Sequence, residues 1–167
     1  MELLIIRHGD AVEDAPGLGD VGRWLTGKGR KTTRHVGSWL AASDARRPVE
    51  IWTSPLVRSV QTAEILAEAA GLTDEVCALA ALSTHGDPDA VLRAVAQHRH
   101  TKGPLALVGH EPSLSYIATQ LLGDVPWSGF KKSGVLAVSW SGHGHATFRF
   151  LLHPKEMLVI DKVGDVR

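Results

Sequence analysis

Short apolar runs alternate with helical stretches along most of this chain, and this alternation restricts its fold more than any other feature. The runs at 3–6 and 104–108 each end in polar residues, as the buried strands of a parallel sheet do. Another strand is predicted at 49–53, and helices are predicted at 28–42, 55–70, 88–98 and 114–122. Strands that alternate with helices build a sheet covered by helices on both faces. The sequence therefore predicts an α/β three-layer sandwich with a mainly parallel central sheet flanked by helices.

Segments with less distinct secondary-structure signals complete the predicted fold. Residues 76–82 indicate a short strand followed by a loop, and residues 10–22 form a loop rich in Gly, Asp and Pro. Two last strands, 134–140 and 146–152, are separated by a turn that contains Gly and His, so we expect an antiparallel hairpin at an edge of the sheet. A length of 167 residues is typical of one domain, which we place at 1–167.

Charge and cysteine content exclude several classes of protein. Lys+Arg and Asp+Glu both number 18, whereas proteins that bind nucleic acid usually carry a basic surplus. The apolar run at 3–6 is too short for a signal peptide core or a membrane span. The single cysteine, Cys77, excludes an intrachain disulfide and a Cys-rich zinc site. We therefore expect a cytoplasmic protein with no nucleic-acid or membrane partner, in which any positive potential is local.

Polar side chains follow three of the predicted strands. Arg7 and His8 follow the first strand, Arg58 lies in the first turn of the helix after the second, and His110 follows the strand at 104–108. In open parallel α/β sheets, ligands bind at the carboxyl ends of the strands. The sequence thus predicts two arginines and two histidines around one crevice.

This combination of side chains suits a phosphoryl group. The guanidinium of arginine matches phosphate geometry and stays charged, and Arg58 near a helix N-terminus has backbone N–H donors beside it. A neutral imidazole can attack phosphorus if its other ring nitrogen donates to an acceptor that sets the tautomer. A second histidine can donate a hydrogen bond to the phosphoryl oxygens. His8 and His110 fit these two roles.

Four motifs, in this order, resemble the signatures of the histidine phosphatase superfamily, which also contains the cofactor-dependent phosphoglycerate mutases. They are L-I-I-R-H-G-D at 4–10, L-T-G-K-G-R at 25–30, T-S-P-L-V-R-S-V-Q-T-A at 53–63 and V-G-H-E-P at 108–112. The short chain and the R-H-G-D-A opening are similar to SixA-type phosphohistidine phosphatases. The resemblance implies a phosphoglycerate mutase-like fold and hydrolysis without a metal or cofactor. It also implies His8 as nucleophile, with Arg7, Arg58 and His110 completing the phosphate pocket.

The chain departs from the larger members of the superfamily in one segment. Those members carry an acidic residue between the signatures that correspond to 53–63 and 108–112, and this residue protonates an alcohol leaving group. Here residues 79–87 contain no carboxylate at an unambiguous place, and Asp87 and His85 are the candidate proton donors. Imidazole leaves more easily than an alkoxide and needs less help from an acid. The departure therefore favours phosphohistidine as the substrate.

The predicted function is a metal-independent phosphatase that removes phosphate from phosphohistidine on a protein, with a histidine-containing phosphotransfer type of domain as partner. A phosphatase for small phosphoesters or polyphosphate is the alternative among enzymes. A non-catalytic module that binds phosphate or phosphoproteins is the alternative of another class. The roles of four residues stay open: Trp24 and Trp127 either line the mouth of the site or cap the core, and Lys131 and Lys132 are either a solvated turn or steer a phosphorylated partner.

Overall fold

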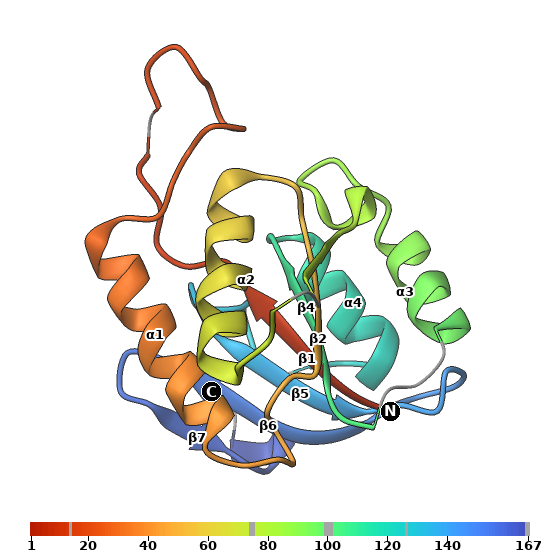
Figure 1. The fold of residues 1–167 in the computed structure, drawn as a ribbon. Helices are drawn as coiled ribbons and strands as arrows, with labels where there is room; N and C mark the ends of the chain where they lie inside the picture. The colour runs from red at the N-terminus through yellow and green to blue at the C-terminus, as the bar shows by residue number, and fades with distance from the viewer. Residues whose placement is uncertain (14, 74–75, 99–101, 126, 166–167) are drawn as a thin grey trace.

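The first apolar run forms β1 (Glu2–Arg7), which lies inside the sheet between β4 (Leu105–Gly109) and β5 (Val135–Ser139). This computed structural model describes residues 1–13, 15–73, 76–98, 102–125 and 127–165 (Figure 1). β1 pairs in parallel with β4 and antiparallel with β5. Its central residues, Leu3 to Ile6, are at most 1% exposed, so both faces of the strand are covered.

Within the described residues the sheet has seven strands, in the order β3-β2-β4-β1-β5-β6-β7. The remaining strands are β2 (Glu50–Thr53), β3 (Val76–Ala78), β6 (Thr147–His153) and β7 (Leu158–Ile160). The pairings among β3, β2, β4 and β1 are parallel, as predicted, and the pairings from β1 to β7 are antiparallel. The predicted hairpin of β5 and β6 is present, but β7 lies outside it at the edge. The prediction missed β7 because this strand is only three residues long and two of them are exposed.

Helices cover both faces of the sheet, which confirms the three layers (Figure 1). α1 (Gly27–Ala41) and α2 (Val57–Ala70) pack with Leu4 and Ile6 on one face, and α3 (Pro88–Gln97) and α4 (Ser113–Leu122) pack with Leu3 and Ile5 on the other. Short 3₁₀ turns lie at Ala80–Leu82 and Val163–Asp165. Within the described part of the chain, no helix combines the length and the apolar character needed to cross a membrane.

Three predicted helix ends show why the sequence folds this way. Thr26 caps α1, because its side chain accepts a hydrogen bond from the backbone of Gly29. Gly71 ends α2 with a φ of 76°, a left-handed conformation that favours glycine. α2 begins at Val57 rather than at Pro55, since Leu56 is still extended with a ψ of 138°.

The N-terminus of α1 lies directly against the chain segment that follows β1. A Cβ atom on Gly29 would lie 2.1 Å from the carbonyl oxygen of Asp10, a backbone atom that cannot rotate away. The Thr26 hydroxyl also donates to the Asp10 carboxylate at 2.9 Å. The L-T-x-x-G spacing therefore brings the first turn of α1 to within contact of the residues next to His8.

We expect Gly29→Ala to reduce the free energy of unfolding by roughly 2 kcal/mol, because the added methyl group forces α1 away from Asp10. Urea denaturation monitored by circular dichroism measures this change. Gly27→Ala is the matched control, since a Cβ at Gly27 meets no atom within 4 Å. Equal stability of the Gly29 variant and the parent chain would show that this contact does not restrict the position of α1.

Candidate active site

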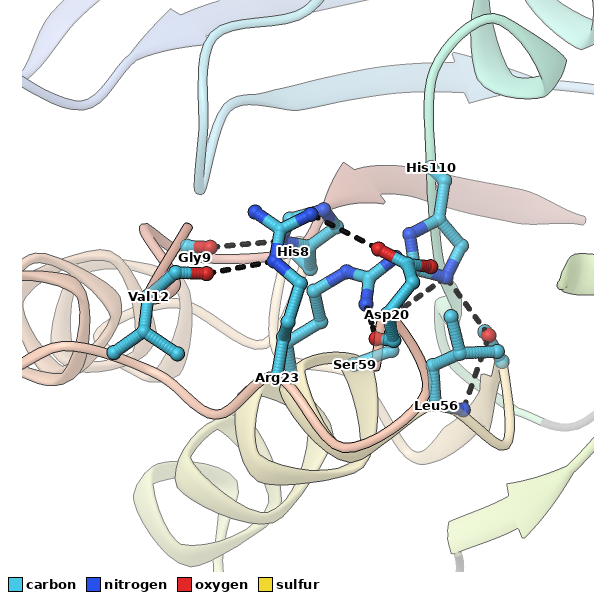
Figure 2. A network of polar contacts seen from close by, with 10 residues as sticks. His8, Gly9, Val12, Asp20, Arg23, Leu56, Ser59 and His110 are labelled. Atoms are coloured by element: carbon cyan, nitrogen blue, oxygen red, sulfur yellow. Dashed lines mark hydrogen bonds and ion pairs between the residues drawn. The ribbon is translucent and has the colours of Figure 1, made fainter. Parts of the chain in front are cut away.

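The carboxyl ends of β1, β2 and β4 meet at one edge of the sheet, as the sequence predicts. Arg7 is paired with Gly109 and Thr53 with Val108, so the residues that follow these strands become neighbours. The imidazole centroids of His8 and His110 lie 4.9 Å apart, with their planes tilted by 55° (Figure 2). Both side chains are buried, at 7% and 2% exposure. The structure thus places the two histidines of the first and fourth motifs side by side.

His8 is held in one tautomer by its own backbone neighbour. Its Nδ1 lies 2.7 Å from the carbonyl oxygen of Gly9, and because a carbonyl only accepts, Nδ1 carries the proton. Nε2 is then left with its lone pair. Burial lowers the pKa of His8 to about 4; the charges of Arg58 and Arg7 act in the same direction, against the hydrogen bond to Gly9. His8 is therefore neutral at neutral pH.

The segment that carries His8 is itself anchored to α2. The Gly9 N–H donates to the hydroxyl of Thr62 at 3.0 Å, and that hydroxyl donates to the carbonyl of Arg58 at 2.7 Å. Thr62 is fully buried, so these bonds form away from water. They hold the Gly9 peptide, and with it the acceptor for His8, in a set orientation.

His110 contacts two serine hydroxyls. Its Nε2 lies 2.8 Å from the hydroxyl of Ser54 and 3.2 Å from that of Ser59, and its Nδ1 edge faces His8 and Asp20 (Figure 2). Burial, followed by the neighbouring His8 and the charge of Arg58, lowers the pKa of His110 to about 3. Both imidazoles are therefore neutral, and the hydroxyls of Ser54 and Ser59 orient the second one.

Arg58 forms an ion pair that the sequence did not reveal. Its side chain is 3% exposed, and Nη1 and Nη2 donate to the backbone carbonyl of Asp20 at 2.7 Å and to its carboxylate at 3.0 Å. Asp20 also pairs with Arg23 at 2.9 Å. Partial burial raises the pKa of Asp20, but the hydrogen bonds from Arg23 and Arg58 outweigh it and hold the pKa below its usual range. The loop between β1 and α1 (residues 8–26), the β1–α1 loop, thus places the ionised carboxylate of Asp20 in contact with Arg58, beside His8 and His110 (Figure 2).

The sequence predicted this segment only as a loop rich in Gly, Asp and Pro, with no role for Asp20. The signal that was available is the position of Arg23, two residues before the L-T-x-x-G motif. Its Nε donates to the carbonyl of Val12 at 2.6 Å, which ties the two ends of the loop together. The charge of Arg23 also lowers the pKa of His8, so Arg23 lies within electrostatic reach of the imidazole pair.

The predicted phosphate-binding residues carry unpaired donors. Four buried side-chain atoms have no hydrogen-bond partner among the described residues: Nε of Arg7, Nε of Arg58, Nδ1 of His110 and Nε1 of Trp127. The Nη1 of Arg7 donates to the carbonyl of Phe130 at 2.6 Å. A buried donor without a partner costs roughly 1–3 kcal/mol, so such groups usually mark a place where a ligand supplies acceptors. Two of these atoms, the Nε of Arg7 and the Nε of Arg58, are N–H donors of the predicted site, and an oxyanion is the ligand that suits them.

The two candidate proton donors lie just before α3, after the 3₁₀ turn at Ala80–Leu82. Asp87 caps α3 and forms a 2.9 Å ion pair with Arg93, with 56% of its side chain exposed. Hydrogen bonds, first from the backbone of Ala90, hold the pKa of Asp87 below its usual range. His85 is exposed. Among the described residues neither forms a hydrogen bond, ion pair or ring contact with the two imidazoles, and no group of three or more His, Cys, Asp or Glu could hold a metal ion.

Trp24 and Trp127, whose roles the sequence leaves undecided, have different surroundings. Trp24 is 42% exposed on the β1–α1 loop. Trp127 is partly buried against the core, with its ring centroid 6.3 Å from that of Phe130. Together with Arg7 and Glu111, it lines a pocket of 680 Å³. Trp127 thus both covers the core and borders a pocket that reaches Arg7.

A sequence model of the histidine phosphatase superfamily (branch 1) matches residues 3–82, which include the motifs around His8 and Arg58. Phosphohistidine phosphatase SixA of Escherichia coli (strain K12) is 29% identical over 157 residues, 92% of this chain and 94% of SixA. Over residues 3–82 the chain matches the histidine phosphatase superfamily, and over most of its length it is similar to SixA. Both likenesses support a phosphatase activity.

Solved structures agree with this assignment. The protein histidine phosphatase SixA complexed with tungstate superposes with a TM-score of 0.83 at 26% identity, covering 95% of this chain and all of that one (100%). A mycobacterial glucosyl-3-phosphoglycerate phosphatase superposes with a TM-score of 0.64 at 20% identity, covering 89% and 95% of the two chains. The second likeness shows the fold alone. The α/β sandwich therefore matches SixA and other phosphoglycerate mutase-like structures.

The low pKa values of the two histidines make the stability of this chain depend on pH. The pKa of His8 is lowered from 6.5 to about 4 and that of His110 to about 3, so below pH 6.5 the unfolded chain binds more protons than the folded chain. Stability therefore falls as the pH drops. We expect the parent chain to lose roughly 1–2 kcal/mol per histidine between about pH 7 and about pH 5 in urea titrations.

His8→Asn removes one of these groups and should make the decrease shallower, whereas replacing the exposed His143 by Asn should leave the slope unchanged. An unchanged slope in the His8 variant would contradict the neutral, buried state of this imidazole.

Asp20 competes with any anion for the guanidinium of Arg58, since its carboxylate already accepts from Nη2. We expect Asp20→Ala to bind inorganic phosphate and tungstate about two- to fivefold more tightly, because a partly exposed ion pair of up to about 1 kcal/mol no longer has to be broken. Isothermal titration calorimetry measures the Kd. Asp44→Ala, which removes an exposed carboxylate paired with Arg47, is the control. Weaker anion binding in the Asp20 variant would show that Asp20 assists binding instead.

Proposed function

We propose that this chain is a metal-independent phosphatase that works through a covalent phosphohistidine at His8 and acts on phosphohistidine carried by a protein. The observation that carries the proposal is the 2.7 Å contact between Nδ1 of His8 and the carbonyl of Gly9. It places the proton on Nδ1, and the low pKa keeps the ring neutral, so Nε2 has a lone pair for attack on phosphorus. A cytoplasmic location remains part of this proposal.

In the first step, the lone pair of His8 Nε2 forms a bond to phosphorus while the P–N bond of the substrate breaks. Its electron pair returns to the substrate imidazole, which leaves as a neutral ring from the form of phosphohistidine whose other ring nitrogen is protonated. Arg7 and Arg58 bind the equatorial oxygens through the donors that have no partner within the described residues, and the Nδ1 side of His110 stabilises the developing charge.

In the second step, a water molecule attacks the phosphorus of phospho-His8. An O–P bond forms, the N–P bond breaks and its electron pair returns to Nε2, while the proton from water passes to a phosphate oxygen. The bond from Nδ1 to Gly9 is kept throughout, so His8 leaves the cycle in the tautomer in which it began.

The surroundings of the site favour a P–N over a C–O–P substrate. An alkoxide leaving group needs a protonated acid beside it. Asp20, the carboxylate nearest to Arg58, has a lowered pKa and stays ionised, and Asp87 is a helix cap with a lowered pKa. An imidazole leaving group does not need this acid. The likeness to phosphohistidine phosphatase SixA supports the same choice, and with it a histidine-containing phosphotransfer type of partner.

A phosphatase for small phosphoesters or polyphosphate is the second candidate. It is supported by the shared fold with a glucosyl-3-phosphoglycerate phosphatase. In that reaction His85 or Asp87 would have to reach the leaving group as proton donor, so replacing them tests it. Loss of ester hydrolysis in Asp87→Asn or His85→Asn, with phosphohistidine hydrolysis unchanged, would support this second candidate.

A substrate panel tests the proposal. The parent chain and His8→Ala are compared on a phosphorylated histidine-containing phosphotransfer domain, a sugar phosphate, a nucleotide and polyphosphate. We expect the highest kcat/KM on the phosphorylated domain, no turnover of any substrate by His8→Ala, and an acid-labile phosphoenzyme only in the parent chain. EDTA should leave the rates unchanged, because no step uses a metal.

The replacement of His98 by Ala is the matched control, since this histidine pairs with Glu50 at 2.9 Å and lies outside the proposed site. Turnover near the parent rate in His8→Ala would overturn the nucleophile. Highest rates on small esters would overturn the substrate, and binding of phosphate without turnover would indicate the non-catalytic alternative.

A further inference from the structure

A second pocket, with a volume of 720 Å³, has five lysines among its lining residues. Its walls come from the first turns of α1, the residues before β5 and the turn between β6 and β7. The lysines are Lys28, Lys31, Lys131, Lys132 and Lys155, against the carboxylates of Asp10 and Glu156. The chain as a whole has no net charge, so this pocket is a local concentration of positive potential.

The lysine pocket opens at the same edge of the sheet as His8. Asp10, which lines it, is two residues after His8, so the two Cα atoms are at most about 7 Å apart. Ser133, another lining residue, donates its backbone N–H to the carbonyls of Arg7 and His8 at 3.1 and 3.2 Å. The β6–β7 turn reaches the same edge, because Val135 pairs with both Ile6 and Leu152.

Most of the positive charge in this pocket is not neutralised locally. Lys132 pairs with Asp10 at 2.5 Å and Lys155 with Glu156 at 3.4 Å. Lys28, Lys31 and Lys131 form no salt bridge with any described residue. The first turn of α1 holds no acidic residue, so Lys28 adds its charge to the positive end of the helix dipole, an arrangement that costs stability. The pocket therefore attracts negative charge at some cost to folding.

The apolar residues in and near the pocket indicate that its ligand is a protein surface. Leu158 is 53% exposed at this pocket, and Pro154 forms part of its wall. The β1–α1 loop, over the neighbouring site, exposes Leu18 at 63% and Val21 at 65%. A free polyphosphate chain gains nothing from apolar side chains, whereas protein interfaces combine apolar contacts with a charged rim.

We propose that the lysine pocket docks an acidic surface of the phosphorylated protein and so presents its phosphohistidine to His8. This inference rests on the proposed function and adds the part of the substrate that is recognised outside the phosphoryl group. Long, exposed lysine side chains on the rim act mainly on the rate of association and on its dependence on salt.

The double variant Lys28→Glu/Lys31→Glu tests the docking surface. Glutamate near a helix N-terminus is favourable, so the variant should fold. We expect its kcat/KM to fall about tenfold on a phosphorylated histidine-containing phosphotransfer domain, with a weaker salt dependence, and to stay unchanged on free phosphohistidine. Lys102→Glu/Lys162→Glu changes the net charge equally at exposed residues that do not line the pocket, and it should match the parent chain.

An unchanged kcat/KM on the phosphorylated domain would overturn the docking surface. A parallel loss on free phosphohistidine would show instead that the lysines belong to the phosphate site, and a loss confined to polyphosphate would show a polyanion site. If the parent chain fails to hydrolyse phosphohistidine, the proposed function is wrong. Binding of the same domain to His8→Ala, measured by calorimetry, then decides the docking separately: no binding, or equal Kd values with and without the two charge reversals, overturns it.

Discussion

The hydrogen bond from Nδ1 of His8 to the carbonyl of Gly9 is the interaction on which the rest of the site depends. It joins a ring to the next peptide in the chain, so its geometry requires that the backbone after β1 be held in one conformation. Thr62 on α2 and the first turn of α1 hold it, through the Gly9 N–H and the close approach of Gly29 to Asp10. The tautomer of one imidazole is thus set by the packing of two helices against the end of one strand.

The burial of polar groups at this site reduces the stability of the folded protein. Two imidazoles are buried in their neutral forms, and Arg58 is buried with one donor that lacks a partner within the described residues. Asp20 offsets part of the cost, because its carboxylate neutralises Arg58. A carboxylate that stabilises the arginine also competes with an incoming oxyanion, so stability and anion binding oppose each other at this one ion pair. The fully buried central strands support the site against this cost.

Much of the fold could be predicted from hydrophobic pattern and helix-end chemistry. The apolar runs of β1 and β4, the Thr26 cap and Gly71 are local signals, and local signals survive in any tertiary context. The predicted start of α2 was two residues early, because proline tolerates both extended and helical starts. The strand β7 was missed, because three residues carry no period. The pairing of β7 with β6 is decided by the sheet edge that β6 offers, which is a tertiary feature.

The sequence by itself determined which residues meet at the site. Arg7, His8 and His110 follow parallel strands directly, and Arg58 lies one turn into the next helix, so chain connectivity alone brings them to one edge. Only the tertiary structure decided the partners of these residues. Asp20 reaches Arg58 through a glycine-rich loop without period, and Asp87 became a helix cap. The lysine pocket joins segments more than 100 residues apart, as the ion pair between Lys132 and Asp10 illustrates. No spacing along the chain encodes contacts of that kind, because they depend on how separate elements pack.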